Sequence, residues 1–507
     1  MVVKRGPTAL RPARASLWNQ LFELHPEAPL SIQAQLRAGI VAAIGDGRIP
    51  RDRPMPSSRE LAQQLGIARN TVVSAYQQLA DDGHLIAHDR RGYFVNPAVV
   101  AARIQPPAAA LGGTATVRDW PARFQLHPSL QRNISKVADW QQYEFPFIYG
   151  QFDPSLFPTS EWRSCCQQVL AGDGALDWAQ DLFTRDDPLL VEQIRNKVLP
   201  LRGVWADTDE VMVTIGAQQA LYLLADLLVG EDTEVGVESP GYPDARNIFS
   251  LRTRRLRGLP IDAEGLQVGP ALDGCQFVYV TPSHQSPTTV TMPVERRLAL
   301  LRRAAEDDFL VIEDDYEHET TFSGLPNPAL KSLDRAGRVI YVGSLSKSFA
   351  PGLRLGYIVA PAPLIAELRA LRRLMIRHPT AFIQRSFAQF LALGHFDLLH
   401  RRLRESHRER ARLLAVALAQ YAPDIRHPPV HGGSSFWLEG PAWLDTARLA
   451  EEARAARILI EPGQVHFFEA SPPGHFFRLG FSSIPAQRIG DGIQRLGALI
   501  EQQRPTG

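Results

Sequence analysis

The sequence predicts an α/β protein in which a small N-terminal module of helices and one hairpin precedes a large domain with a mostly parallel central sheet. The length of 507 residues is too great for one hydrophobic core and fits two or three domains. Helical periodicity and a hairpin pattern occupy the first 96 residues. From about residue 145, nearly continuous apolar strands alternate with helical segments, which is typical of a buried parallel sheet covered by helices.

The N-terminal elements follow from periodicity and from capping residues. Apolar residues recur every four positions over 32–44, which places them on one face of a helix. Ser57 and Glu60 have the spacing of a capping box at the start of a second helix. The expected elements are helices over 31–44, 58–65 and 70–79 and strands over 85–88 and 93–95. Together they predict a winged helix-turn-helix at residues 18–96.

A proline-containing segment separates this module from the large domain. Residues 97–143 have scattered prolines and no sustained period, so we expect a linker that is partly extended and partly docked. The large domain then spans residues 144–507. Its expected strands lie at 211–214, 233–237, 277–280, 309–312 and 338–342, and a smaller C-terminal α+β subdomain is expected to contain strands at 435–438 and 476–481.

Composition narrows the class of protein. A hydrophobic content of 45%, a charged content of 21% and a net charge of +1 describe an ordinary globular chain. Three cysteines, two of them adjacent, cannot form a disulfide framework and lack the spacing of metal ligands. We therefore expect reduced thiols, no metal site and a cytoplasmic protein. No apolar run approaches the ~18 residues of a membrane span, so we expect no membrane partner.

A lysine that follows a predicted strand carries the strongest chemical signal. Lys347 lies in the run Gly-Ser-Leu-Ser-Lys-Ser-Phe-Ala-Pro-Gly-Leu-Arg at 343–354. Ser344 can donate to a phosphate oxygen and Arg354 can bind the phosphate with its planar guanidinium, so the lysine amine is free to condense with an aldehyde. The run predicts pyridoxal 5′-phosphate (PLP) as the cofactor, with a solvated surface loop as the alternative for these residues alone.

Three further segments are expected at the same edge of the sheet. The run Gly216-Ala217-Gln218 opens a helix, whose free N–H groups can bind phosphate. Tyr242 follows a strand through a Pro-Gly turn and can stack on a pyridine ring. Acids at 313–315 end a buried strand, where one carboxylate can hold the pyridine nitrogen protonated and Tyr316 can bond the phenolic oxygen. Ordinary turns, core packing and helix capping are the alternatives for each segment alone.

With these motifs, residues from about 144 to 500 resemble fold-type I aminotransferases, and the whole chain resembles the MocR/GabR-type transcriptional regulators. In that family a GntR-like winged helix-turn-helix precedes an aminotransferase-like domain. The resemblance also rests on Pro-Ser-Ser-Arg-Glu-Leu-Ala at 56–62, Arg-Asn-Thr-Val at 69–72, Arg-Gly-Tyr-Phe-Val at 91–95, Thr-Pro-Ser-His-Gln at 281–285, Arg-Leu-Gly-Tyr at 354–357 and Arg-Leu-Gly-Phe at 478–481.

The resemblance implies roles for individual residues. Lys347 would form the internal aldimine, and Asp314, preferred over Asp315, would pair with the ring nitrogen. Arg478 matches the arginine that takes a ligand α-carboxylate, a bidentate task that suits a guanidinium. The resemblance further implies a homodimer in which the two chains are domain-swapped.

Two motifs depart from the family pattern. Ser-Pro-Thr-Thr at 286–289 replaces Asn-Pro-Thr-Gly, so the asparagine that contacts the ring oxygen is absent and Thr289 stands in place of glycine. The run 183–188 lacks the Tyr and the Gly of the common Tyr-Gly-Asp-Pro-x-Gly pattern. These changes argue against complete transamination and against the usual effector pocket, and they leave the PLP-binding motifs intact.

The winged helix predicts how DNA would be bound. The third helix of such a module enters the major groove, with its first residues near base edges. We expect Arg69, Asn70 and Thr71 to contact bases, with helix capping as the alternative for the last two. The residues better suited to phosphates are Ser57, Ser58, Arg59, Arg90 and Arg91.

Two functions are compatible with these features. The favoured one is a regulator, not an enzyme, that binds operator DNA and senses PLP, or an amino-acid or amine effector, through Lys347. The alternative is a working aminotransferase with an accessory N-terminal domain. The regulator is favoured because the winged helix keeps its basic DNA-facing residues while the enzyme motifs are the ones that depart.

Overall fold

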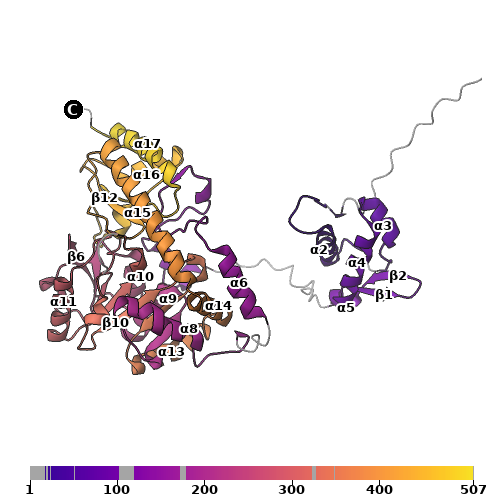
Figure 1. Ribbon diagram of the computed structural model, residues 1–507, viewed down its shortest axis with the longest axis horizontal. Helices are drawn as coiled ribbons and strands as arrows, with labels where there is room; N and C mark the ends of the chain where they lie inside the picture. The colour runs from indigo at the N-terminus through magenta and orange to yellow at the C-terminus, as the bar shows by residue number, and fades with distance from the viewer. Residues whose placement is uncertain are drawn as a thin grey trace, which may run out of the picture. The chain divides into compact units, whose positions relative to one another are not determined.

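The computed structural model of the chain describes residues 18, 21, 22, 24–50, 52–101, 119–171, 178–322, 327–347 and 349–505 (Figure 1). The chain divides into two compact units, Met1–Arg123 and Phe124–Gly507. The predicted linker at 97–143 therefore contributes to both units, and its residues 102–118 lie outside the described part of the chain.

The N-terminal unit has the predicted order of elements. It contains α2 (Ile32–Gly45), α3 (Ser58–Leu65), α4 (Arg69–Asp81), β1 (Leu85–His88), β2 (Gly92–Val95) and α5 (Pro97–Ala101). Ser31 and Ser57 each accept a hydrogen bond from a backbone N–H of the first turn, which starts α2 and α3. The two strands pair as an antiparallel hairpin, and the inward faces of the three helices form one core with Leu85 and Val95. The predicted winged helix-turn-helix is thus confirmed.

The larger unit is built on an eight-stranded mixed sheet. In spatial order its strands are β4 (Val211–Thr214), β11 (Gly356–Val359), β10 (Val339–Ser344), β9 (Leu310–Asp315), β8 (Phe277–Val280), β5 (Val235–Ser239), β6 (Leu256–Asp262) and β7 (Gly265–Leu266). The five strands from β10 to β6 are parallel, and β11 and β7 pair in the antiparallel sense. The mostly parallel sheet was therefore predicted correctly, although three of its strands were not.

Helices cover both faces of this sheet (Figure 1). One face packs on α9 (Gly216–Leu228), α10 (Pro243–Ser250) and α13 (Ala362–Ile376). The other face packs on α8 (Pro188–Gln193), α11 (Val294–Glu306) and α14 (Ala381–Ala392). Two further helices of the unit are α6 (Thr159–Leu170) and α12 (Leu330–Leu333). Strand residues alternate between the two faces, as the pleat of a β-strand requires.

A smaller subdomain follows the sheet in sequence. It contains α15 (His395–Tyr421), the antiparallel strands β12 (Ser435–Glu439), β15 (Phe476–Gly480) and β14 (Glu461–Pro462), and the helices α16 (Thr446–Ala455) and α17 (Ile489–Gln502). The start of the unit also joins it, because β3 (Phe145–Pro146) pairs in parallel with β13 (Ile458–Leu459). Phe145 and Phe147 lie in its core, so the subdomain is not purely C-terminal.

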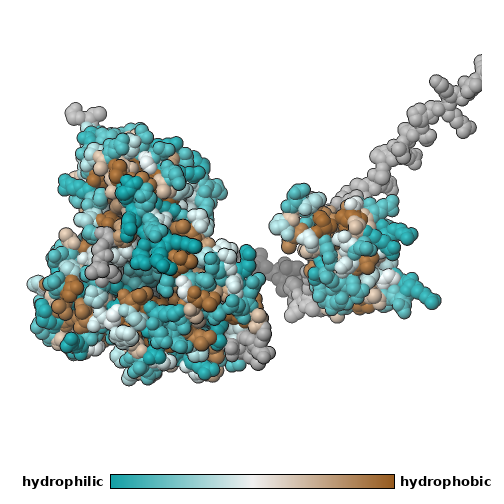
Figure 2. Space-filling model, in the orientation of Figure 1, coloured by the Kyte–Doolittle hydropathy of each residue, from teal (hydrophilic) through white to brown (hydrophobic). Residues whose placement is uncertain are grey.

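Hydrophilic residues cover most of the visible face of each unit, and apolar residues are interspersed among them (Figure 2). Among the described residues, no helix combines the length and the apolar run needed to cross a bilayer.

Candidate cofactor pocket and DNA-facing surface

All ten residues predicted for the cofactor and its ligand line one cavity at the carboxyl edge of the sheet. The ten are Gly216, Ala217, Gln218, Tyr242, Asp314, Tyr316, Ser344, Lys347, Arg354 and Arg478. Most of them follow strand ends or start helices of the large sheet, Lys347 and Arg354 lie between β10 and β11, and Arg478 comes from β15 of the smaller sheet. Sequence reasoning missed the other lining residues, which are Ile134, Tyr149, Ser286, Ser346 and Pro351.

One end of the cavity is suited to an anion. Gly216 has a φ of +70° and begins α9, so backbone N–H groups of the first turn face the cavity without a side chain between them. A Cβ at Gly216 would lie 3.0 Å from a guanidinium nitrogen of Arg354, which shows how closely this arginine approaches the turn. Ser344 is buried at the end of β10. Within the described residues Arg354 has no ion-pair partner, and its charge is available to a phosphate.

Lys347 is enclosed by aromatic rings. Its Nζ lies 4.1 Å from the ring centroid of Tyr149 and 5.4 Å from that of Tyr316. Burial lowers the pKa of Lys347 to about 8, with the charge of Glu317 opposing this shift and those of Lys136 and Arg478 adding to it. A substantial fraction of this amine is therefore neutral near physiological pH, as a nucleophile requires.

Asp314 is a buried carboxylate with one free oxygen. Its Oδ2 accepts a hydrogen bond of 2.8 Å from Tyr279, and its Oδ1 has no hydrogen-bond partner. Burial raises the pKa of Asp314 to about 6, although the hydrogen bond from Tyr279 opposes the shift. An unpaired oxygen in a buried site indicates that a donor group belongs there.

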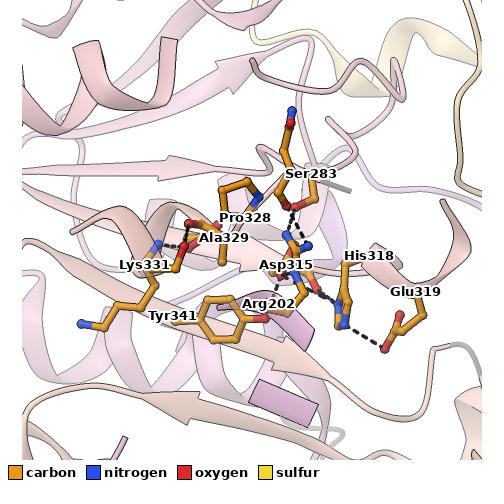
Figure 3. A network of polar contacts seen from close by, with 12 residues as sticks. Arg202, Ser283, Asp315, His318, Glu319, Pro328, Ala329, Lys331 and Tyr341 are labelled. Carbon is orange, nitrogen blue, oxygen red and sulfur yellow. Dashed lines mark hydrogen bonds and ion pairs between the residues drawn. The ribbon is translucent and has the colours of Figure 1, made fainter. Parts of the chain in front are cut away.

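The neighbouring acid lies on the opposite face of β9. Asp315 is paired with Arg202, whose Nε donates to Oδ2 over 2.7 Å, and Tyr341 donates to the same oxygen over 2.7 Å (Figure 3). Burial alone would raise the pKa of Asp315, but the charge of Arg202 holds it well below its usual value. Alternation along the strand thus places Asp314, and not Asp315, in the cavity.

Two of the predicted lining residues are tyrosines, Tyr242 and Tyr316. The Tyr242 hydroxyl donates to Asp244 over 3.0 Å, which fixes the ring beside the start of α10. Burial, followed by the charge of Glu317, raises the pKa of Tyr316 well above its usual value, against a hydrogen bond with Ser286. Ser286 is the residue that replaces the expected asparagine, so a hydroxyl stands in the cavity where the family usually has an amide.

Arg478 lies on β15 and is 1% exposed. Its Nε donates to Glu461 over 2.8 Å, its guanidinium carbon lies 4.0 Å from the ring centroid of Tyr149, and one terminal nitrogen has no hydrogen-bond partner. A buried guanidinium nitrogen without an acceptor is suited to a carboxylate or another acidic group of a ligand.

The departures from the family pattern have different structural settings. Thr289 has a φ of +62°, a conformation that glycine adopts readily and a β-branched residue rarely does, and its hydroxyl has no partner. Asp186 pairs with Arg369 over 2.7 Å and with Arg372 over 2.6 Å, and Asp187 caps α8. The run 183–188 therefore keeps its structural acids although it lacks the usual Tyr and Gly.

The predicted DNA-facing residues lie at two places on the N-terminal unit. Arg69 and Asn70 are exposed in the first turn of α4, and Thr71 is half-buried there. Ala68 is the N-cap of this helix and no side chain caps it, so the capping alternative for Asn70 and Thr71 is wrong. The N-terminus of α3 carries Ser57, Ser58 and Arg59, whereas Arg90 and Arg91 are exposed in the hairpin turn.

Each of the two units matches a known protein family. The family of bacterial regulatory proteins, gntR family, matches residues 32–95, and aminotransferase class I and II matches residues 186–496. The HTH-type transcriptional regulator TauR of Rhodobacter capsulatus is 43% identical over 94% of this chain and 98% of its own length. The chain belongs to the MocR-type transcriptional regulators. Its GntR-type domain is the DNA-binding part of such regulators.

Other members and a solved structure support the same assignment. The probable rhizopine catabolism regulatory protein MocR of Rhizobium meliloti is 28% identical over 94% of this MocR-type chain and 95% of its own. The crystal structure of Pyrococcus horikoshii kynurenine aminotransferase in complex with PMP matches 76% of this chain and 99% of its own, with 26% identity and a TM-score of 0.70. The fold-type I prediction is confirmed, and the regulator is favoured over the enzyme because the similar full-length relatives are regulators.

Proposed function

We propose that this MocR-type regulator binds PLP covalently through Lys347, and that PLP or an amino compound reacting with it changes the affinity of the winged helix for operator DNA. The observation that carries the proposal is the convergence of ten predicted residues on one cavity, in which Asp314 Oδ1 and a guanidinium nitrogen of Arg478 lack hydrogen-bond partners among the described residues. A buried polar atom without a partner is costly, so its retention favours a ligand that satisfies it.

The residues fit the parts of PLP one by one. The first turn of α9, Ser344 and Arg354 form the anion-binding end that a phosphate needs. Asp314 offers its free Oδ1 to a protonated ring nitrogen, and Tyr242 offers an aromatic face. Bound PLP supplies an aldehyde that condenses with primary amines and a pyridine ring that withdraws electrons.

Proton positions follow from the pKa shifts. Lys347, with a pKa of about 8, holds its amine neutral in a fraction of molecules that rises as the pH passes that value. Asp314, with a pKa of about 6, is ionised above that pH and can hold a proton on a nitrogen opposite Oδ1. Tyr316 keeps its phenolic proton and can donate it in a hydrogen bond.

We further propose that α4 reads DNA through Arg69, Asn70 and Thr71. Arginine pairs with guanine edges and asparagine with adenine edges, and the residues at the start of this helix are available because none is used as a cap. Ser57, Ser58, Arg59, Arg90 and Arg91 are proposed to bind phosphates. One winged helix reads a short half-site, which calls for a dimer on repeated half-sites.

A homodimer is also consistent with the surface near the pocket. Leu374 is 85% exposed and Met375 is 42% exposed at the end of α13. The sulfur of Met375 lies 3.8 Å from Nε2 of Gln219, the residue that follows the phosphate-binding run. A second chain covering these apolar side chains would lie beside the phosphate end of the cavity.

The cofactor assignment can be tested by absorption spectroscopy. PLP-loaded full-length protein is compared with Lys347→Ala and with Lys347→Arg, which keeps the positive charge. We expect the wild type alone to show the visible band of the covalently bound cofactor. A band that persists in both variants would contradict the role of Lys347. Arg354→Gln should keep the band but bind PLP at least about tenfold more weakly.

A further inference from the structure

The segment 131–137 of the larger unit contributes Ile134 to the lining of the cofactor pocket and residues 132–137 to a neighbouring cavity. Gln131 donates to the carbonyl of Asn247 over 3.1 Å, and Arg132 donates to the carbonyl of Phe467 over 3.1 Å. The Arg132 carbonyl in turn accepts from the Asn247 side chain over 3.0 Å. These bonds fix the segment to α10, the helix that begins next to Tyr242, and Ile134 reaches the cavity itself.

Two residues after Ile134, this segment places a second amine beside Lys347. A Cβ at Gly150 would lie 3.3 Å from the Nζ of Lys136 and 3.9 Å from the Nζ of Lys347. The two amines are therefore no more than about 7 Å apart. Lys136 is exposed, and within the described residues no carboxylate lies within 4 Å of its Nζ.

A third cation, Arg478, contacts the same tyrosine ring as Lys347. The Nζ of Lys347 is 4.1 Å and the guanidinium carbon of Arg478 is 4.0 Å from the ring centroid of Tyr149. Lys347 thus has two cations near it, Lys136 and Arg478. Arg478 has a carboxylate partner, Glu461, whereas Lys136 has none among the described residues. Arg478 lines the cofactor cavity, whereas Lys136 lines a neighbouring cavity that shares Ile134 and Tyr149 with it.

We propose that Lys136 is a specificity-determining residue for the effector and that the effector is a small primary amine carrying two acidic groups. Its amine lies at Lys347, one acidic group at Arg478 and the second at Lys136. The distances are short enough for a molecule of a dicarboxylic amino acid's size. This inference rests on the proposed function, because the amine position is defined by the cofactor at Lys347.

Calorimetric titration of the PLP-loaded full-length protein tests this assignment. L-Aspartate and L-glutamate serve as diacidic probes and L-alanine as the monoacidic probe. We expect the wild type to bind at least one diacid more tightly than L-alanine. Lys136→Ala should lower the affinity for that diacid by at least about tenfold and change the affinity for L-alanine by less than about twofold. Lys136→Arg should retain most of the preference. Ser135→Ala, an exposed neighbour in the same segment, is the matched control and should behave as the wild type.

The outcomes separate the two proposals. Equal weakening of diacid and monoacid in Lys136→Ala, an unchanged diacid affinity, or a wild type without a diacid preference would overturn the role of Lys136. The visible absorption spectrum is recorded on the same samples. A normal cofactor band in every sample, combined with one of these results, would leave the proposed function standing, whereas a wild type without the band would overturn both.

Discussion

Asp314 and Asp315 are consecutive residues of β9, yet the chain treats their carboxylates in opposite ways. Asp315 receives hydrogen bonds from Arg202 and Tyr341, and its pKa is held low by Arg202 although burial would raise it (Figure 3). Asp314 receives one bond from Tyr279, keeps an unpaired Oδ1 and has a pKa raised to about 6 by burial. The difference teaches that the chain pairs both oxygens of one carboxylate and leaves one oxygen of its neighbour, inside the cavity, for another donor.

The same contrast holds for the residues around each acid. On the Asp315 side, the carboxylate of Glu313 accepts from the backbone N–H groups of Leu330 and Lys331 over 2.7 and 2.8 Å. On the Asp314 side, Arg478 keeps a guanidinium nitrogen without an acceptor. One face of β9 therefore pairs both oxygens of Asp315 and of Glu313, and the other face leaves an oxygen of Asp314 without a partner among the described residues.

The largest expected effect is on the completed side. Asp315→Ala should lower the free energy of unfolding by about 3–5 kcal/mol, because it leaves the buried guanidinium of Arg202 without its carboxylate. Denaturant unfolding of the apo protein measures this. Arg202→Met in the Asp315→Ala background should recover part of the loss. An Asp315→Ala variant as stable as the wild type would contradict the structural role assigned to the Asp315 face of β9.

Asp314→Asn should act in the opposite direction on stability. A carboxyl whose folded pKa is raised destabilises the folded state as the pH rises from its unfolded value of 3.8 through about 6. Without that carboxyl, the apo variant should be more stable than the wild type at pH 8 by up to about 3 kcal/mol. Its PLP affinity should fall at least tenfold. Denaturant unfolding and PLP titration of the same samples check both, and an apo variant that is less stable would contradict this account of Asp314.

The comparison extends to α4, where Asn70 is exposed in the first turn and Arg69 donates only a long hydrogen bond of 3.4 Å to Ser58. Asn70→Ala should weaken binding to a specific operator by about 1–3 kcal/mol and relax discrimination at one base pair. Arg90→Ala should lower the affinity for specific and for non-specific DNA alike and reduce the salt dependence of binding. Fluorescence anisotropy with both kinds of DNA measures this. If Asn70→Ala lowered the affinity for operator DNA and for non-specific DNA equally, Asn70 would contact phosphates and not a base.

The smallest effect is expected at Thr289, where strain lies close to the pocket. Thr289→Gly should stabilise the protein by about 1 kcal/mol, because glycine adopts a φ of +62° without steric cost. The higher chain entropy of glycine in the unfolded state sets an upper limit on this gain. Thermal unfolding measures the stability of Thr289→Gly and of the control Thr288→Gly, which should destabilise the protein. A destabilised Thr289→Gly would show that the threonine side chain has a compensating role.

The sequence predicted those parts of the molecule in which local pattern and tertiary structure agree. The capping serine at 57 and the apolar strands at 211–214, 277–280 and 338–342 were sufficient for the winged helix and the parallel sheet. Strand β11 was missed because a short antiparallel strand inserted between β4 and β10 has no local signal for its position. Strand β6 contains Arg257, Gly258 and Pro260, which weaken a strand pattern.

The pocket was predictable where its residues follow strand ends, and less so elsewhere. Strand alternation separates Asp314 from Asp315 only once the register of β9 is known. Tyr149 and Ile134 come from segments without regular strand or helix, so no periodicity marks them. The aromatic run that ends at Tyr149 and Gly150 was the one available signal for that wall.

The central claim is that cofactor chemistry at Lys347 is coupled to DNA binding. The most direct test is the titration of labelled DNA from upstream of this gene with the apo and PLP-loaded full-length protein at one fixed salt concentration. We predict that the two forms differ in affinity by about 5- to 150-fold, the range of a typical allosteric coupling, and that Lys347→Ala binds DNA with no response to PLP. Equal affinities of the two wild-type forms, or a PLP response that survives in Lys347→Ala, would contradict the claim.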